Sequence, residues 1–145
     1  MTTAPSWVYG VLAWPGLWIL TRVGLSSAYL VGGVTKLVDF HGAMAEQAHF
    51  GLQPAWIWAG LAVIVEIVGS LALILGRWIW LAAGALSALT IIATLVADPF
   101  WSLQGHDRFV ALNTFLEHIG LIAGLAMAAV IAADKTPASA TVGRE

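Results

Sequence analysis

The sequence predicts an all-α integral membrane protein, folded as a four-helix antiparallel bundle. Of the 145 residues, 60% are hydrophobic and only 10% are charged, and the mean hydropathy is +0.89. A soluble domain has about 25% charged residues, so this chain lacks the charge to cover a surface in water. A span needs about 20 apolar residues to cross a hydrocarbon core of ~30 Å. Four stretches reach that length, at about 12–34, 56–75, 78–97 and 112–132.

Tryptophan placement supports the ends of these spans. Near the ends expected on the side of the termini stand Trp7, Trp14, Trp18, Trp78 and Trp80. Toward the opposite ends stand Trp56, Trp58 and Trp101. Tryptophan gathers at both membrane interfaces, where its ring contacts hydrocarbon while its polar edge stays hydrated. The clustering therefore favours four spans with both termini on one side of the bilayer.

The connection between the first two spans is long and contains the stretch GAMAEQAHF. Its spacing of apolar residues predicts a short interfacial helix, with Met44, Ala48 and Phe50 toward lipid. We expect one transmembrane domain over residues 1–135. The tail at 136–145, TPASATVGRE, is small and polar and is expected to be disordered.

The link Gly76-Arg77 is so short that the second and third spans must be antiparallel neighbours. On the terminus side the basic residues are Arg77, Lys135 and Arg144. On the loop side they are Lys36 and Arg108. Because cytoplasmic loops are enriched in Lys and Arg, this bias predicts cytoplasmic termini, and we expect the protein in a bacterial inner membrane.

Each span has its polar and small residues on one helical face. The faces consist of Arg22, Ser26, Tyr29, Gly33 and Lys36 on the first span, Glu66 and Ser70 on the second, Ser87, Thr90, Thr94 and Asp98 on the third, and Asn113, Glu117, Gly120 and Gly124 on the fourth. Helices in lipid turn such a face toward the interior of a bundle, so the four faces are expected to converge.

Glu66 stands in the apolar stretch AVIVEIVGS, where an ionised side chain needs a partner or a task. A helix rises ~1.5 Å per residue, which puts Glu66 at the middle of the second span and Arg22 close to the middle of the first. We therefore expect Arg22 and Glu66 to form a structural ion pair that fixes the packing of their helices.

A second group of polar residues is expected at one depth nearer the loop side, where it would line a vestibule. The ligand-binding candidates there are Tyr29, Lys36, Asp98, Trp101 and Asn113, and the catalytic candidates are Glu117 and His118. Adjacent helical residues point about 100° apart, so we expect Glu117 to face inward and His118 to lie at the edge. Either side chain is of a type that exchanges protons with a bound molecule. The alternative for His118 is a structural hydrogen bond, to Asn113 or to a backbone carbonyl.

Several kinds of site are disfavoured. The chain has no cysteine, which excludes disulfides and thiolate metal ligands. A b-type haem would need a second axial histidine, and His118 is the only histidine inside a predicted span. The net charge of −2 comes without a basic cluster for nucleic acid. We thus expect no metal and no intrinsic cofactor.

Four segments follow one another along the chain: RVGLSSAYLVGGVTKLVDFHG, FGLQPAWIWAGLAVIVEIVGSLALILGRW, ATLVADPFW and ALNTFLEHIGLIAGLAM. In order and spacing they resemble the DoxX family of small four-helix membrane proteins. Two departures from the family pattern fall in the predicted vestibule. The family commonly has Lys-Asn at Glu117-His118, and it more often has a histidine at Asp98.

The resemblance implies an association with membrane redox chemistry. Founding members of the family are subunits of a thiosulfate:quinone oxidoreductase, and others are linked to oxidative-stress complexes or to catechol and quinone resistance. The resemblance favours a membrane subunit that contacts a bound quinone and receives electrons from a protein partner with a redox centre. A non-catalytic accessory or assembly subunit of a larger complex and a carrier or sensor of small hydrophobic molecules are the alternatives. Catalytic activity and homo-oligomerisation are left open.

Overall fold

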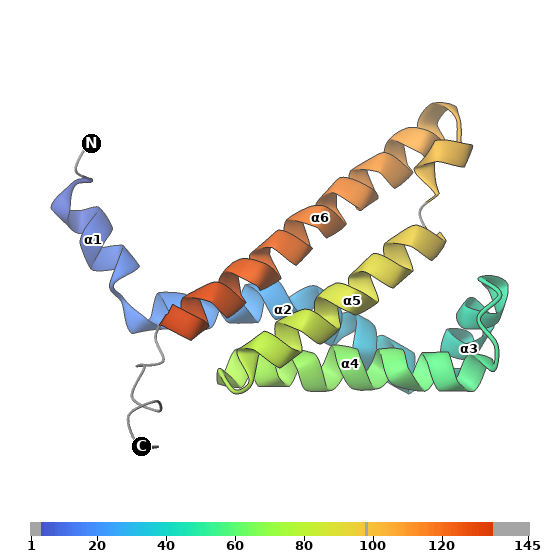
Figure 1. Ribbon diagram of the computed structural model, residues 1–145, viewed down its shortest axis with the longest axis horizontal. Helices are drawn as coiled ribbons and strands as arrows, with labels where there is room; N and C mark the ends of the chain where they lie inside the picture. The colour runs from blue at the N-terminus through green and yellow to red at the C-terminus, as the bar shows by residue number, and fades with distance from the viewer. Residues whose placement is uncertain (1–3, 98, 135–145) are drawn as a thin grey trace, which may run out of the picture.

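The computed structural model of the chain describes residues 4–97 and 99–134 (Figure 1). Along the chain its elements are α1 (Ser6–Leu12), α2 (Pro15–Val38), α3 (Phe40–His49), α4 (Ala55–Leu75), α5 (Ile79–Ala97), the 3-10 helix η1 (Phe100–Ser102) and α6 (Gly105–Asp134). Helices α2, α4, α5 and α6 are long and apolar enough to cross a membrane. The predicted all-α membrane fold with four spans is thereby confirmed. Asp98 and the tail expected to be disordered lie outside the described residues.

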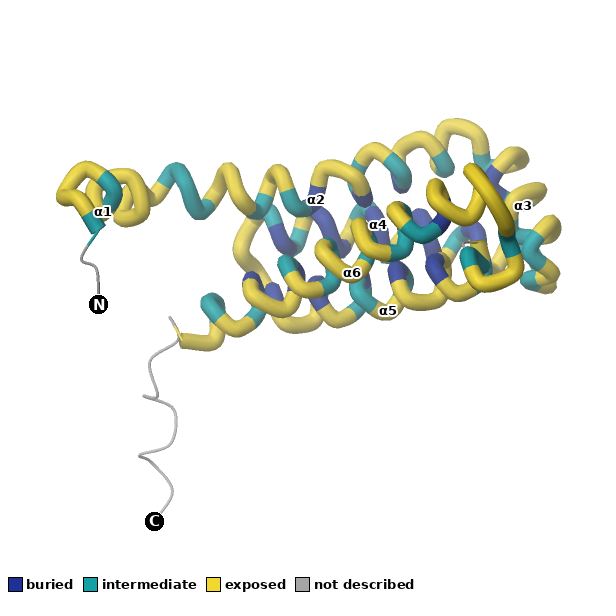
Figure 2. Tube along the Cα trace, turned by 90° about the horizontal axis from the view of Figure 1, so that it is seen from above, coloured by how far each residue is buried: buried dark blue, intermediate teal, exposed yellow. Residues whose placement is uncertain are grey.

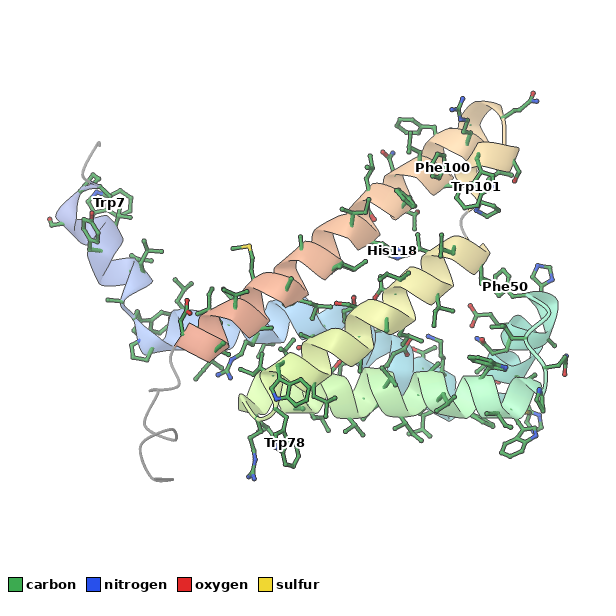
Figure 3. The ribbon with its side chains drawn as sticks, in the orientation of Figure 1. Trp7, Phe50, Trp78, Phe100, Trp101 and His118 are labelled. Carbon is green, nitrogen blue, oxygen red and sulfur yellow. The ribbon has the colours of Figure 1, made fainter. Side chains whose placement is uncertain are left out.

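The first span begins and ends later in the chain than the sequence predicts. Helix α2 starts at Pro15 and continues to Val38, in place of the predicted 12–34. Proline suits the first helical position, because the N–H that it lacks has no partner there. The residues before it form the separate helix α1, which turns away from the axis of α2 and presents Trp7 away from the bundle (Figures 1 and 3).

Helices α2 and α4 pack closely through small residues. A Cβ added to Gly33 would lie 2.9 Å from the Cβ of Glu66 and 2.8 Å from Cγ1 of Ile67. Nearer the termini, the Ser70 hydroxyl donates a 3.4 Å hydrogen bond to the Ser26 carbonyl. Small residues allow membrane helices to approach, and van der Waals contact between them then replaces contact with lipid.

The turn between α4 and α5 makes these helices antiparallel neighbours, as predicted. Gly76 ends α4 in the left-handed region with φ 74°, a conformation that glycine adopts without strain. Across the pair, the Leu86 side chain fills the space beside Gly69, 3.0 Å from where a Cβ would stand. Leu73 and Leu86 are fully buried here, together with Leu125 of α6.

Helix α6 packs mainly on α5. Figure 1 shows it running beside α5 and diverging from α4, and Figure 2 shows most of its surface exposed. Its close approach to α2 is near Gly124, where an added Cβ would lie 3.1 Å from Cδ1 of Leu25. Large apolar side chains such as Phe109, Leu116 and Met127 cover its outer surface, which suits contact with lipid.

The predicted short helix between the first two spans is α3. The Asp39 side chain caps it by accepting a 2.9 Å hydrogen bond from the Gly42 N–H. Ala43 is buried against the bundle, and the helix packs on the N-terminal part of α4. Phe50 follows its last turn at the loop-side end of the molecule (Figure 3). Helix α3 therefore forms one wall of any space that opens between α4 and α5.

Candidate functional site

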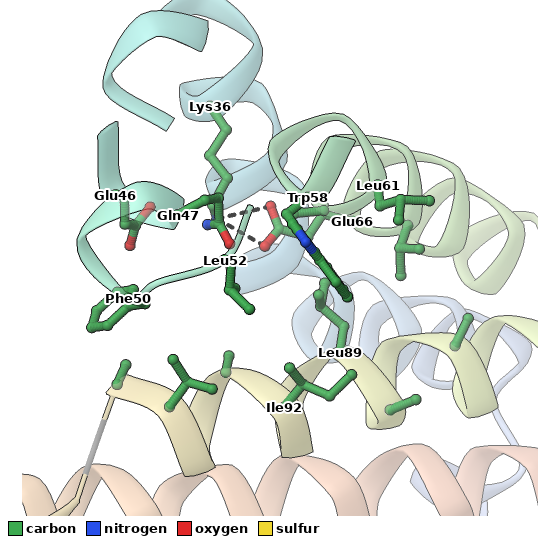
Figure 4. A pocket seen from close by; sticks show the side chains of 17 residues that line it. Lys36, Glu46, Gln47, Phe50, Leu52, Trp58, Leu61, Glu66, Leu89 and Ile92 are labelled. Atoms are coloured by element: carbon green, nitrogen blue, oxygen red, sulfur yellow. Dashed lines mark hydrogen bonds and ion pairs between the residues drawn. The ribbon is translucent and has the colours of Figure 1, made fainter. Parts of the chain in front are cut away.

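A cavity of about 380 Å³ lies between α3, α4 and α5, on the loop-side half of the bundle (Figure 4). Its apolar walls include Leu52, Trp58, Leu61, Val65, Leu89 and Ile92. Its polar lining residues are Lys36, Glu46, Gln47 and Glu66. A concave apolar space with a few convergent polar groups is the usual form of a small-molecule site.

Lys36 and Glu66 form an ion pair at the wall of this cavity. The Lys36 ammonium donates hydrogen bonds of 2.8 Å to Oε1 and 3.1 Å to Oε2 of Glu66 (Figure 4). The Glu66 side chain is 11% exposed and that of Lys36 is 23% exposed. Water screens such a pair little, so removal of one member would leave a poorly solvated charge. The pair explains how α4 holds a carboxylate within its apolar run.

The predicted pairing of Arg22 with Glu66 is wrong, because the two residues lie at different depths. Gly33 of α2 stands beside Glu66, while Arg22 contacts Gly76 at the other end of α4. Glu66 and Gly76 are ten residues apart, which is about 15 Å along a helix. The predicted depths came from a span at 12–34. The observed helix continues past residue 34, and this brings Lys36 to the level of Glu66.

A chain of hydrogen bonds links α2, α5 and α6 beside the cavity. The Thr90 hydroxyl donates to the Leu86 carbonyl at 2.8 Å, so it accepts from the buried Tyr29 hydroxyl, 2.7 Å away. The Thr94 hydroxyl likewise donates to the Thr90 carbonyl at 2.6 Å. It therefore accepts from Nδ1 of His118 at 2.7 Å, which assigns the proton of a neutral His118 ring to Nδ1.

The structure separates the predicted vestibule residues. Lys36 lines the cavity, and Tyr29 and His118 belong to the hydrogen-bonded chain. Asn113 and Glu117 are exposed on α6, and Trp101 is 57% exposed in η1. Asp98 is outside the described residues. The six described side chains therefore do not form one site.

The expected orientations of Glu117 and His118 are also corrected. His118 faces the neighbouring helix α5, as its bond to Thr94 shows, whereas Glu117 is exposed instead of facing inward. Because α6 packs on α5 rather than closing over all three other spans, its inward face is the one with His118, Leu125 and Ala128. The predicted catalytic role of Glu117 and His118 stays a prediction.

Sequence reasoning missed the contribution of α3 to the cavity. Glu46 and Phe50 both line it and are four residues apart, so they share a helical face. The spacing of Glu46 and Phe50 could have indicated that they face the same space. From the sequence we instead predicted that Phe50 faces lipid. What sequence spacing does not give is the angle at which α3 returns across the loop-side end of α4 and α5.

Comparison with known proteins identifies the family to which the chain belongs. No curated protein and no solved structure matches it. The sequence model of one family, DoxX, matches residues 17–99, which is more than half of the chain. The matched segment contains α2 from residue 17 onward and all of α3, α4 and α5, and with them both members of the Lys36–Glu66 pair and every wall of the cavity. The resemblance read from the sequence is thus confirmed, and this four-span membrane protein belongs to the DoxX family.

Proposed function

We propose that this protein binds the head of a membrane quinone or quinol in the cavity between α3, α4 and α5, as the membrane subunit of an oxidoreductase. The observation that carries the proposal is the Lys36–Glu66 pair, which reaches the wall of a cavity of about 380 Å³ whose lining is mostly apolar. Ligand sites of roughly 300 to 1,000 Å³ with apolar walls and a few polar groups are typical of proteins.

The two side chains suit the chemistry of a quinone. Reduction adds two electrons and two protons to the quinone, and its two carbonyl oxygens become the two hydroxyls of the quinol. The Lys36 ammonium is a hydrogen-bond donor for one quinone carbonyl oxygen. Glu66 passes the two protons to the quinone oxygens one at a time, as the carboxylic acid gives up a proton and the carboxylate takes the next one from water. The electrons come from the redox centre of a protein partner, which is itself part of the proposal.

Access from the bilayer supports a hydrophobic ligand. Trp58, Leu61 and Ile92 line the cavity and yet are 37%, 48% and 46% exposed. In a membrane these exposed side chains face lipid, because they belong to the crossing helices α4 and α5. A molecule with an isoprenoid tail therefore enters sideways, with its head toward Lys36 and its tail left among the acyl chains.

Binding of a short-tailed ubiquinone analogue to the purified protein tests the proposal. Ala88 is an exposed cavity residue of α5, so Ala88→Trp fills the cavity without touching the ion pair. We expect Ala88→Trp to raise the Kd of the analogue roughly tenfold or more, since the ring must be displaced or excluded. Leu81→Trp is the matched control, because Leu81 is also exposed on α5 and does not line the cavity.

The same preparations separate the alternatives. An unchanged Kd of the quinone analogue in Ala88→Trp would show that the quinone does not bind in this cavity. A larger complex that copurifies without quinone, and whose assembly no cavity variant affects, would replace the proposal by an accessory subunit. Retention of phenolic compounds without any electron exchange with a copurified partner would replace it by a carrier or sensor.

A further inference from the structure

A second cavity, of about 530 Å³, lies between α2 and α6 toward the terminus side. Its apolar walls include Leu17, Leu25, Gly124, Met127 and Ile131. It shares no lining residue with the cavity between α3, α4 and α5. It therefore needs an explanation that is separate from the proposed quinone site.

Arg22 is the charged residue of this cavity. Its Nε donates a 3.4 Å hydrogen bond to the Trp18 carbonyl, and its guanidinium carbon lies 5.5 Å from the centre of the Trp18 ring. Among the residues that the structure describes, no carboxylate forms an ion pair with Arg22. A guanidinium has five N–H donors, and the bond to the Trp18 carbonyl uses one of them, so Arg22 has further donors to offer an anion.

The depth of Arg22 indicates what kind of anion it meets. Arg22 contacts Gly76, which ends α4 in the turn to α5. Because α4 and α5 both cross the membrane, this turn lies at the membrane surface. Arg22 is thus level with the headgroups of that leaflet, while Leu25 and Gly124 stand deeper, toward the acyl chains.

We propose that the α2–α6 cavity is a binding site for an anionic phospholipid of the leaflet on the terminus side. The phosphate accepts hydrogen bonds from the Arg22 guanidinium, and an acyl chain lies against Leu25, Gly124 and Met127. Guanidinium matches phosphate in both charge and donor geometry. The lipid also fills the space between α2 and α6 on the terminus side, so it completes packing that the chain alone leaves open.

Native mass spectrometry of the full-length protein in mild detergent tests this site. The probes are phosphatidylglycerol, phosphatidylcholine with the same acyl chains, and oleate. We expect wild type to retain phosphatidylglycerol in preference to phosphatidylcholine, and Arg22→Gln to weaken that retention roughly tenfold through loss of a charged hydrogen bond. Arg77→Gln is the matched control, since Arg77 also lies on the terminus side and stacks on Trp78 at 5.6 Å, outside the cavity.

A variant that keeps Arg22 guards against misfolding of Arg22→Gln. Met127 is 64% exposed and lines the cavity, so Met127→Trp fills it from the lipid side and should weaken phosphatidylglycerol retention as well. Val130→Trp, at a residue of α6 that is 61% exposed and outside the cavity, should not. Binding of the quinone analogue should match wild type in all four variants.

Three results would overturn the assignment. Equal retention of the two phospholipids by wild type would show that the site does not select an anionic headgroup. Undiminished phosphatidylglycerol retention in folded Arg22→Gln and in Met127→Trp would show that the lipid does not bind in this cavity. Retention of oleate in place of phosphatidylglycerol would identify a free fatty acid, and not a phospholipid, as the anionic amphiphile.

Discussion

The Lys36–Glu66 pair is the residue-scale feature on which both stability and the proposed site depend. From the sequence we expected Glu66 to pair with a cation, because a carboxylate in an apolar span is costly without a partner. The sequence did not show which cation, since Arg22 and Lys36 are on the same face of one helix and differ only in depth. That depth depends on where the helix begins, and Pro15 sets the start later than hydropathy alone suggests.

Variants of Lys36 and Glu66 test whether Lys36 or Arg22 is the partner of Glu66. Lys36→Met alone and Glu66→Leu alone should each destabilise the protein by about 3–5 kcal/mol, because each leaves one poorly solvated charge without its partner. The double variant Lys36→Met/Glu66→Leu should recover most of that loss. The measurement is thermal unfolding of the detergent-purified proteins, with accumulation in the membrane as a second readout.

Arg22 provides the control for this comparison. Glu66→Leu should not rescue Arg22→Leu, since the Arg22 guanidinium lies beside Gly76 and Trp18 and not beside Glu66. Rescue in the Arg22 background, together with none in the Lys36 background, would restore the pairing that sequence reasoning favoured.

At the scale of elements, the close approach of α2 and α4 fixes the register that aligns Lys36 with Glu66. Gly33→Ala would place a methyl group 2.8 Å from Cγ1 of Ile67 and 2.9 Å from Cβ of Glu66, which forces the helices apart. We expect a loss of about 1–3 kcal/mol in stability, the usual cost of overpacking. Gly24→Ala on the same helix meets nothing within 4 Å and should be neutral or stabilising, as alanine is the better helix former.

Thermal unfolding of these two variants beside wild type measures the effect. Equal midpoints for Gly33→Ala and Gly24→Ala would mean that α2 and α4 are not in contact at Gly33.

The polar faces on α2, α4 and α5 could be predicted from spacing, because they converge as expected at Ser26, Ser70 and Thr90. The direction in which the polar face of α6 points could not be predicted from spacing. Its orientation depends on packing against α5, and sequence periodicity does not choose between a helix that closes a bundle and one that lies on its side.

At the scale of the whole molecule, the structure changes how the charges count toward orientation in the membrane. Lys36 is neutralised by Glu66 inside a span, so it no longer counts as a free charge of the loop side. Arg22 is level with the turn at Gly76 and joins Arg77 on the terminus side. In the described part of the chain, Arg108 is then the remaining basic residue of the loop side. The bias toward cytoplasmic termini is stronger than the sequence count of three against two.

We therefore predict that α1 lies on the cytoplasmic side and that the connection between α5 and α6 lies outside. The chain has no cysteine, so a thiol introduced at Ser6 or at Gln104, both of them exposed, reports its own position alone. A membrane-impermeant maleimide should label Gln104→Cys in intact spheroplasts, and should label Ser6→Cys only after the membrane is opened. These two sites are separated by the three crossings of α2, α4 and α5, so they must lie on opposite sides and one labels whenever the other is protected. Labelling of Ser6→Cys in intact spheroplasts, with Gln104→Cys protected, would reverse the orientation and would place the phospholipid site in the outer leaflet.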